Sequence, residues 1–187
     1  MADLTGIPWD QFPENAAMND KVSSNFTLYE LIRSDTAERA GIDNQFASVH
    51  ELRAAVYICR NVLQKVRDQF GSFTPNSVYR SQALERVLKR KPADWVSHSQ
   101  HAMGQACDIE VNGESTLGLA KWVEENLTFD QLICECYNQA KGPNSGWVHV
   151  SIKPPGTEEN RGEVLSYIYD KTRGKYVYVK GLVESPQ

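Results

Sequence analysis

Hydrophobic positions recur at helical spacing in the first half of the chain and alternate with polar positions in much of the second half. A capping-box pattern at residues 48–51 opens the longest helical stretch, which ends at Gly71. The same pattern at residues 27–30 opens a shorter helix that Gly41 closes. Two further helices are expected at residues 82–91 and 116–126. The longest helix carries a core-facing apolar stripe, formed by Val49, Leu52, Val56, Cys59, Leu63, Val66 and Phe70.

Short apolar or alternating segments bounded by turn residues predict the strands. They lie at residues 77–80, 106–111, 131–137 and 147–152, and residues 164–169 and 176–179 form a terminal hairpin. Helices mostly precede strands, and hairpin-style loops connect the strands. This order predicts an α+β fold with helices packed on a central antiparallel sheet. One domain over residues 25–187 is expected after an irregular lead-in, residues 1–24.

Three of the expected strands each place one polar residue on the face opposite their apolar side chains. Alternation assigns Asp108, Glu135 and His149 to this face, because their strand neighbours are apolar. His101 precedes the strand at 106–111 by a few residues, and Gly104 permits a sharp turn between them. We therefore expect these polar side chains to meet on one concave sheet face.

Two imidazoles and one carboxylate are a typical three-ligand set for catalytic zinc, with the fourth position left to water. A nearby glutamate can accept a proton from that water. Taken singly, Asp108 could be a turn residue and Glu135 a paired strand charge. A carboxylate within an apolar strand is costly without a partner, however, and this favours a site. His50 and His98 are assigned no role.

The composition is that of an ordinary globular domain. The chain has 187 residues, of which 41% are hydrophobic and 24% charged, and a net charge of −4. This charge argues against a general nucleic-acid binder, and the basic run at residues 89–91 fits a helix end. No apolar run reaches the length of a membrane span, and residues 1–21 lack the pattern of a secretion signal.

The cysteines show no disulfide-framework spacing. The Cys-Glu-Cys sequence at residues 134–136 could suggest a thiolate metal site, but structural zinc favours pairs spaced as Cys-x-x-Cys. We expect buried free thiols and a chain folded in a reducing compartment. The four residues are Cys59, Cys107, Cys134 and Cys136.

Two motifs together resemble a known family. The pattern S-x-H-x-x-G-x-A-x-D at residues 99–108, followed by W-x-H at residues 147–149, resembles the zinc D-Ala-D-Ala carboxypeptidases. That family shares its core with the hedgehog signalling domain and with D-Ala-D-Ala dipeptidases. The V-Y-R-S segment at residues 78–81 is similar to the family's G-Y-R-S, with Val78 in place of glycine. The resemblance spans residues 26–164 and is strongest to compact phage- and prophage-borne members.

The resemblance implies roles for individual residues. It assigns zinc to His101, Asp108 and His149, and it assigns a carboxylate-binding and catalytic role to Arg80. Several branches place the catalytic glutamate three residues before the last histidine, where this chain has a glycine. The branch resembled here has it at the end of the preceding strand, which is Glu135, although Glu110 is also near the metal strand. Substrate contacts are further implied for Ser99 and Trp147.

The implied substrate is a peptidoglycan stem peptide, cut as by a D-Ala-D-Ala carboxypeptidase or an L-Ala-D-Glu endopeptidase. Such a chain, made in a bacterial cytoplasm without a signal peptide, would be an endolysin released at lysis or a virion-borne wall hydrolase. Two alternatives stay open. One is a catalytically silent, metal-bearing virion or interaction module of the same fold. The other is a ferrous oxygenase, whose usual H-x-D spacing is absent here.

Overall fold

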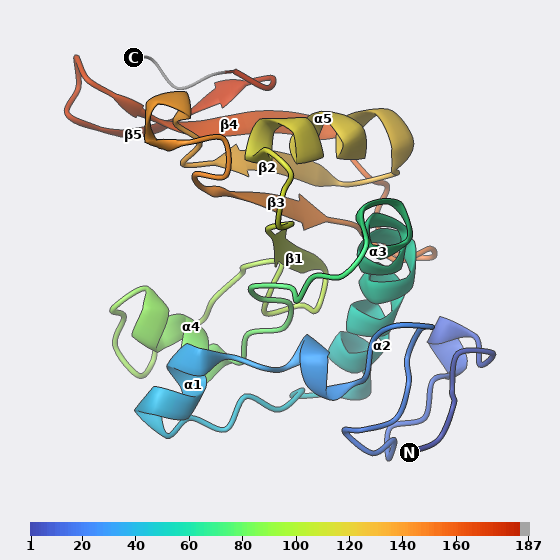
Figure 1. The fold of residues 1–187 in the computed structure, drawn as a ribbon. Coiled ribbons are helices and arrows are strands. Elements are labelled where there is room, and N and C mark those ends of the chain that lie inside the picture. Colours follow the sequence, from blue (N-terminus) through green and yellow to red (C-terminus); the bar gives the residue numbers. More distant parts are fainter. Residues whose placement is uncertain (184–187) are drawn as a thin grey trace.

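The computed structural model describes residues 1–183, so the last four residues of the expected 25–187 domain lie outside it. One sheet has the strand order β1-β3-β2-β4-β5 (Figure 1). Its strands are β1 (Ala106–Ile109), β2 (Gln131–Glu135), β3 (Trp147–Ser151), β4 (Glu163–Asp170) and β5 (Lys175–Lys180). The α-helices are α1 (Asp35–Ala40), α2 (Val49–Ile58), α3 (Gln64–Phe70), α4 (Gln82–Leu88) and α5 (Thr116–Asn126).

The α+β class is confirmed, but the expected antiparallel sheet is wrong in one respect. Strand β2 pairs antiparallel with β3 on one side and parallel with β4 on the other. The connection from β3 to β4, residues 152–162, passes the start of β2 at Asp130 and does not join neighbouring strands as a hairpin would. Strand β4 therefore runs in the same direction as β2, and the sheet is mixed.

The helix expected at residues 27–41 is two separate pieces. The Glu30 carboxylate accepts from the Thr27 amide at 2.8 Å, as a capping box requires, but it opens only the 3₁₀ turn η2 (Tyr29–Leu31). The chain then extends at Ser34, whose hydroxyl accepts from the Ala37 amide at 3.2 Å. This Ser34 N-cap starts α1, and Gly41 ends the helix in the left-handed conformation.

The long helix from Ser48 to Gly71 is continuous through a π-helical turn, η3 (Cys59–Leu63), between α2 and α3. Within this turn the Arg60 guanidinium donates to the carbonyl oxygens of Leu4, Ile7 and Val22 at 2.9, 2.5 and 2.7 Å. These bonds fasten residues 1–24, which contain no α-helix, to the helical layer. No helix within residues 1–183 is long and apolar enough to cross a membrane.

Helix α5 covers one face of the sheet (Figure 1). The apolar side chains of β2 and β3 belong to the same buried core as α5. Three of the cysteines are buried in this core, as expected, whereas Cys136 is only half-buried because it follows the end of β2. Burial raises the pKa of Cys59 and of Cys134 to about 12. By alternation, the opposite face of the sheet carries the polar residues.

The short strand expected at residues 77–80 is a single bridge between Ser77 and Asp108. The pairing ends there because the amides of Tyr79 and Arg80 bind other partners. The Tyr79 amide donates to the Leu31 carbonyl oxygen, and the Arg80 amide donates to that of His101. This segment thereby fastens the start of β1 and the His101 loop to each other.

Gly104 provides the turn expected between His101 and β1. Its φ is +69°, and a Cβ there would lie 2.2 Å from the Glu51 carbonyl oxygen of α2. Gly113 also has a positive φ, +89°, but has open space around it. The positive φ at both positions would strain the backbone of any other residue. Only at Gly104 would the added side chain also clash with the backbone of α2.

We predict that Gly113→Ala lowers the free energy of unfolding by about 1 kcal/mol, from backbone strain alone. Gly104→Ala should lower it by at least about 3 kcal/mol, because the clash with Glu51 is added. Urea unfolding of both variants measures the difference. Equal losses would show that the approach of the His101 loop to α2 does not constrain residue 104.

Candidate metal centre and its cavity

Strand register brings the predicted ligands together. Asp108 of β1 lies directly opposite His149 of β3, and the preceding loop adds His101. His101 Nε2 lies 3.2 Å from Asp108 Oδ1 and 3.2 Å from His149 Nδ1, and the last two atoms are 3.0 Å apart. All three side chains are buried. Three potential ligand atoms therefore converge on one point, as the alternation of the strands predicted.

The donor set fits a metal ion. His101 Nδ1 donates to the Val78 carbonyl oxygen at 2.7 Å, so the Nε2 lone pair of the neutral ring faces Asp108 and His149. Burial lowers the pKa of His101 and favours this neutral form, in which imidazole binds metals. Burial opposes the charge on Asp108, but the two facing histidines outweigh it and hold its pKa well below the usual range.

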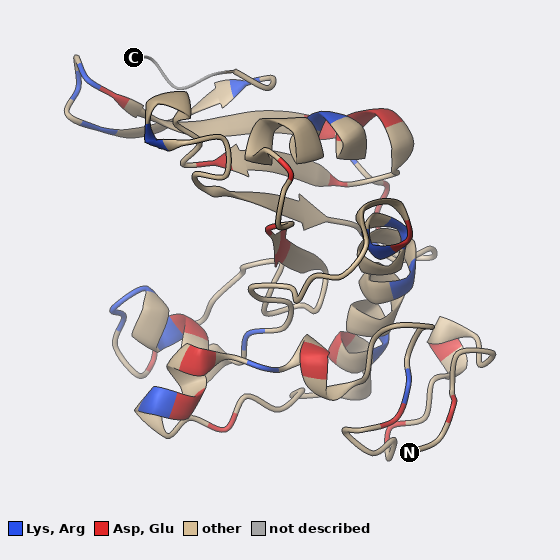
Figure 2. Cartoon of the chain, viewed as in Figure 1, with Lys and Arg blue, Asp and Glu red and all other residues tan. Residues whose placement is uncertain are grey.

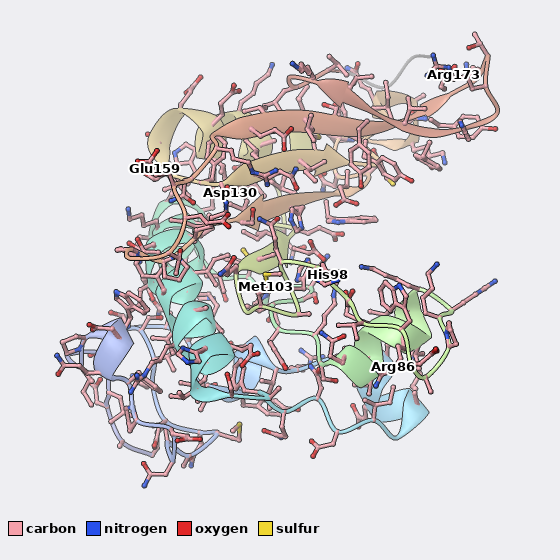
Figure 3. All side chains as sticks on the ribbon, turned by 180° about the vertical axis from the view of Figure 1, so that it is seen from behind. Arg86, His98, Met103, Asp130, Glu159 and Arg173 are labelled. Atoms are coloured by element: carbon pink, nitrogen blue, oxygen red, sulfur yellow. The ribbon has the colours of Figure 1, made fainter. Side chains whose placement is uncertain are left out.

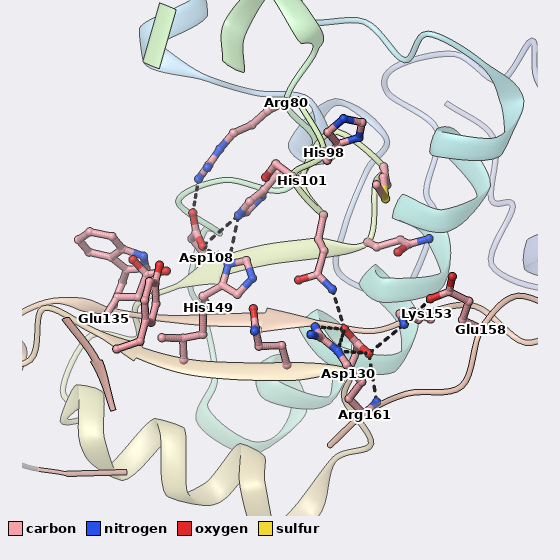
Figure 4. A pocket seen from close by; sticks show the side chains of 18 of the residues that line it. Arg80, His98, His101, Asp108, Asp130, Glu135, His149, Lys153, Glu158 and Arg161 are labelled. Carbon is pink, nitrogen blue, oxygen red and sulfur yellow. Dashed lines mark hydrogen bonds and ion pairs between the residues drawn. The ribbon is translucent and has the colours of Figure 1, made fainter. Parts of the chain in front are cut away.

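Arg80 holds the second oxygen of the Asp108 carboxylate. Its Nη2 pairs with Asp108 Oδ2, and its Nε donates to the Ser77 hydroxyl at 2.7 Å. The carboxylate is thus divided, with Oδ2 toward the guanidinium and Oδ1 toward the histidines (Figure 4). A charged partner of this kind fixes the orientation of a ligating carboxylate.

Glu85, which no sequence pattern selects, extends this arrangement into α4. Its side chain is fully buried, and Oε2 accepts from the Ser97 hydroxyl and pairs with Lys89 Nζ, both at 2.6 Å. Its Oε1 has no hydrogen bond and lies 3.7 Å from Arg80 Nη1. The guanidinium of Arg80 therefore lies between two carboxylates, and both are buried.

Glu135 ends β2 directly opposite Trp147, which lies two residues before His149 in β3 and so shares its face. Burial, with the nearby Asp108 charge, raises the pKa of Glu135 above its ordinary value. Glu110 follows the end of β1 and lines a different cavity from Glu135. Gly146, three residues before His149, has a φ of +75°, and a Cβ there would meet the Glu135 carbonyl oxygen at 2.0 Å. A glutamate is therefore sterically disfavoured at 146.

A cavity of about 750 Å³ is lined by every residue to which the resemblance assigns a role. His98, which received no role, is exposed at its wall and is not part of the ligand group. The predicted site residues that line it are Arg80, Ser99, His101, Asp108, Glu135, Trp147 and His149.

The other end of this cavity holds an ionic group that sequence reasoning missed, here named the Asp130 cluster: Asp130, Gln100, Lys153 and Arg161. Asp130 is fully buried at the start of β2 (Figure 3). It accepts from Gln100 Nε2 at 2.7 Å and pairs with Arg161 at 2.6 Å and Lys153 at 3.3 Å. Burial alone would raise the pKa of Asp130, but the hydrogen bonds from Arg161 and Gln100 lower it far below its ordinary value. In the sequence, Asp130 is marked only by its position as a charged residue directly before an apolar strand.

In the comparison with family models, the model described as Peptidase M15 matches residues 24–151, which include every ligand candidate, Arg80 and Glu135. The match ends with β3, before the β4–β5 hairpin. No curated protein matches the chain.

The lowered pKa of Asp130 predicts a pH-dependent contribution to stability. The contribution is present above the unfolded pKa of about 4 and is lost as pH falls toward the lower folded value. At pH 7, Asp130→Asn should lower the free energy of unfolding by about 2 kcal/mol, and this difference should shrink between pH 4 and pH 2.

Denaturant unfolding over this pH range measures the effect, with the exposed Asp94→Asn as matched control. A difference that stays constant down to pH 2 would mean that the charge of Asp130 contributes nothing through Arg161 and Lys153.

Proposed function

The chain belongs to the M15 peptidase family, and from this we propose that it is a zinc-dependent peptidase acting on the stem peptides of peptidoglycan. The observation that carries the proposal is the convergence of His101 Nε2, Asp108 Oδ1 and His149 Nδ1 in a cavity that also contains Glu135. Two imidazoles and one carboxylate leave a position for water, as catalytic zinc sites require. When bound there, zinc lowers the pKa of a water molecule and polarises the scissile carbonyl.

Glu135 supplies the proton transfer in this proposal. Its carboxylate accepts a proton from the attacking water and returns it to the leaving amine. The position of Glu135 supports this role, because it lines the same cavity as the three converging side chains. This base in the cavity argues against the catalytically silent alternative, which would need no half-buried carboxylate beside the ligands.

Arg80 has two roles in the proposal. It orients Asp108 through Oδ2, and the part of its guanidinium that reaches the cavity binds a substrate carboxylate. Its side chain is 20% exposed, enough to meet a ligand while staying paired. Ser99 and Trp147 line the cavity near it and contact the peptide.

The stem peptide is favoured as substrate by the resemblance of the motifs and by the ionic groups at both ends of the cavity. Arg80 lies at one end and the Asp130 cluster at the other. Such a cavity suits a short peptide that carries both carboxylates and an amine. We propose cleavage either before the terminal D-Ala or between L-Ala and D-Glu, in a phage lysis enzyme or a virion-borne wall hydrolase.

Defined muropeptides, read by product mass, test this function. The wild-type protein should release D-Ala or cut the stem near D-Glu, lose activity to a chelator and regain it with zinc.

Glu135→Gln keeps shape but removes the base, so kcat should fall at least about a hundredfold with zinc content unchanged. Glu110→Gln is the matched control and should stay near wild type. The reverse pattern would transfer the base role to Glu110, and intact muropeptides with the zinc-loaded protein would refute the substrate.

A paired acid and amide peptide test the carboxylate-binding role of Arg80. Wild type should favour the free acid. Arg80→Ala should lower kcat/KM for both peptides, because Asp108 loses its partner, but the loss for the acid should exceed that for the amide at least about thirtyfold, because only the acid also loses its carboxylate contact. Steady-state kinetics on both peptides provide the measurement. Equal turnover of acid and amide by the wild type would restrict Arg80 to holding Asp108.

A further inference from the structure

Tyrosines continue the site face of the sheet across the C-terminal hairpin. Register places Trp147, Glu135, Tyr167 and Tyr178 in one row across β3, β2, β4 and β5. Directly opposite residues share a face, so this row lies on the same face as His149. The next tyrosine pair of the hairpin, Tyr169 and Tyr176, belongs to that face too, because each lies two residues along its strand.

The four tyrosines form one continuous aromatic surface, here named the tyrosine row: Tyr167, Tyr169, Tyr176 and Tyr178. Tyr167 packs against Tyr178 with ring centroids 4.5 Å apart and against Tyr176 at 5.2 Å, and Tyr169 meets Tyr176 at 5.3 Å. Three of them are exposed, Tyr178 by 58%. Charges lie at the ends of β4 and β5, whereas the middle of both strands is uncharged (Figure 2).

The tyrosine row joins the cavity of the candidate metal centre. Tyr178 lines that cavity together with Glu135 and Trp147. Burial and the nearby Glu135 charge raise the pKa of Tyr178, which keeps its hydroxyl protonated. The family match ends before the hairpin, so the likeness to M15 peptidases does not account for these residues. A molecule held at the ligand group can therefore reach the tyrosines without leaving the surface.

We propose that the tyrosine row binds the glycan strand to which the stem peptide is attached. This inference rests on the proposed function, since it takes the substrate to be a peptide linked to sugar. Sugar rings have apolar C–H faces and polar hydroxyls, and tyrosine offers an apolar ring with a polar tip. A continuous set of exposed tyrosine rings therefore suits a chain of sugars.

The contrast between an ionic cavity end and an uncharged aromatic surface orients the substrate. The stem peptide carries ionised groups of both signs, and at the Asp130 end of the cavity Lys153 and Arg161 pair with Asp130, Glu158 and Glu163. The tyrosine row carries no formal charge among its own side chains and suits the uncharged faces of the sugar rings. The peptide thus extends from the ligand group toward Asp130, and the glycan leaves past Glu135 over Tyr178 and Tyr176.

Peptide-free glycan strands, prepared by removing the stem peptides with an amidase, test the surface without any cleavage. The wild-type protein should bind them by calorimetry, and Tyr176→Ala/Tyr178→Ala should bind at least about tenfold more weakly. Tyr29→Ala is the matched control, because Tyr29 is 52% exposed in η2, outside the sheet, and should bind as wild type does. Absence of wild-type binding, or equal binding by the double variant, would overturn the proposal.

An NMR titration of the wild-type protein tests the same surface without relying on a variant that could misfold. Titration with the same glycan strands should shift the aromatic NMR signals of Tyr176 and Tyr178 and leave those of Tyr29 in place. Shifts at none of the hairpin tyrosines would refute the glycan surface. A dimer that dissociates in the double variant, seen by sedimentation, would instead identify a second copy of the chain as the occupant and overturn it.

Cleavage assays separate this proposal from the proposed function. The ratio of kcat/KM for a glycan-linked stem peptide to that for the free peptide should exceed one and fall toward one in Tyr176→Ala/Tyr178→Ala. Cleavage of both peptides with a wild-type ratio of one would refute the glycan surface alone. Glycan binding through the tyrosines without cleavage of either peptide would refute the peptidase function alone.

Discussion

The antiparallel pairing of β1 with β3 is the constraint on which the site depends. It places Asp108 opposite His149 in one row of the sheet, and the turn at Gly104 brings His101 into contact with both. A slip of one residue would turn Asp108 or His149 into the apolar core beneath α5. Each of these buried polar groups needs partners, and they satisfy one another while Arg80 holds the outer carboxylate oxygen.

The fold was predictable where periodicity and capping agree. The cap at Ser48, the end at Gly71 and the limits of α5 lie where local pattern places them. The break at Ser34 was missed because two capping signals follow each other and only tertiary contacts choose between one helix and two. Local pattern also could not predict the parallel pairing of β2 with β4. That pairing arises because residues 152–162 pass the start of β2 and place β4 on its other side.

The ligand group was predictable because strand alternation and a short, specific motif select the same residues. The groups around these residues could not be predicted from the sequence. Glu85 sits in an ordinary amphipathic helix, and only the fold shows it fully buried beside Arg80. In the Asp130 cluster, Gln100 lies 30 positions before Asp130 and Arg161 lies 31 positions after it, so no local spacing predicts the cluster. The tyrosines of the hairpin alternate along their strands, but their continuity with Glu135 follows from the parallel register alone.

Zinc location is the most direct test of the central claim that His101, Asp108 and His149 form one metal site. Crystals of the zinc-loaded protein, measured on both sides of the zinc absorption edge, show where the metal lies. The account predicts one anomalous peak about 2.0–2.2 Å from His101 Nε2, His149 Nδ1 and Asp108 Oδ1. A peak elsewhere, or an undiminished peak at this position in His149→Ala crystals, would contradict it.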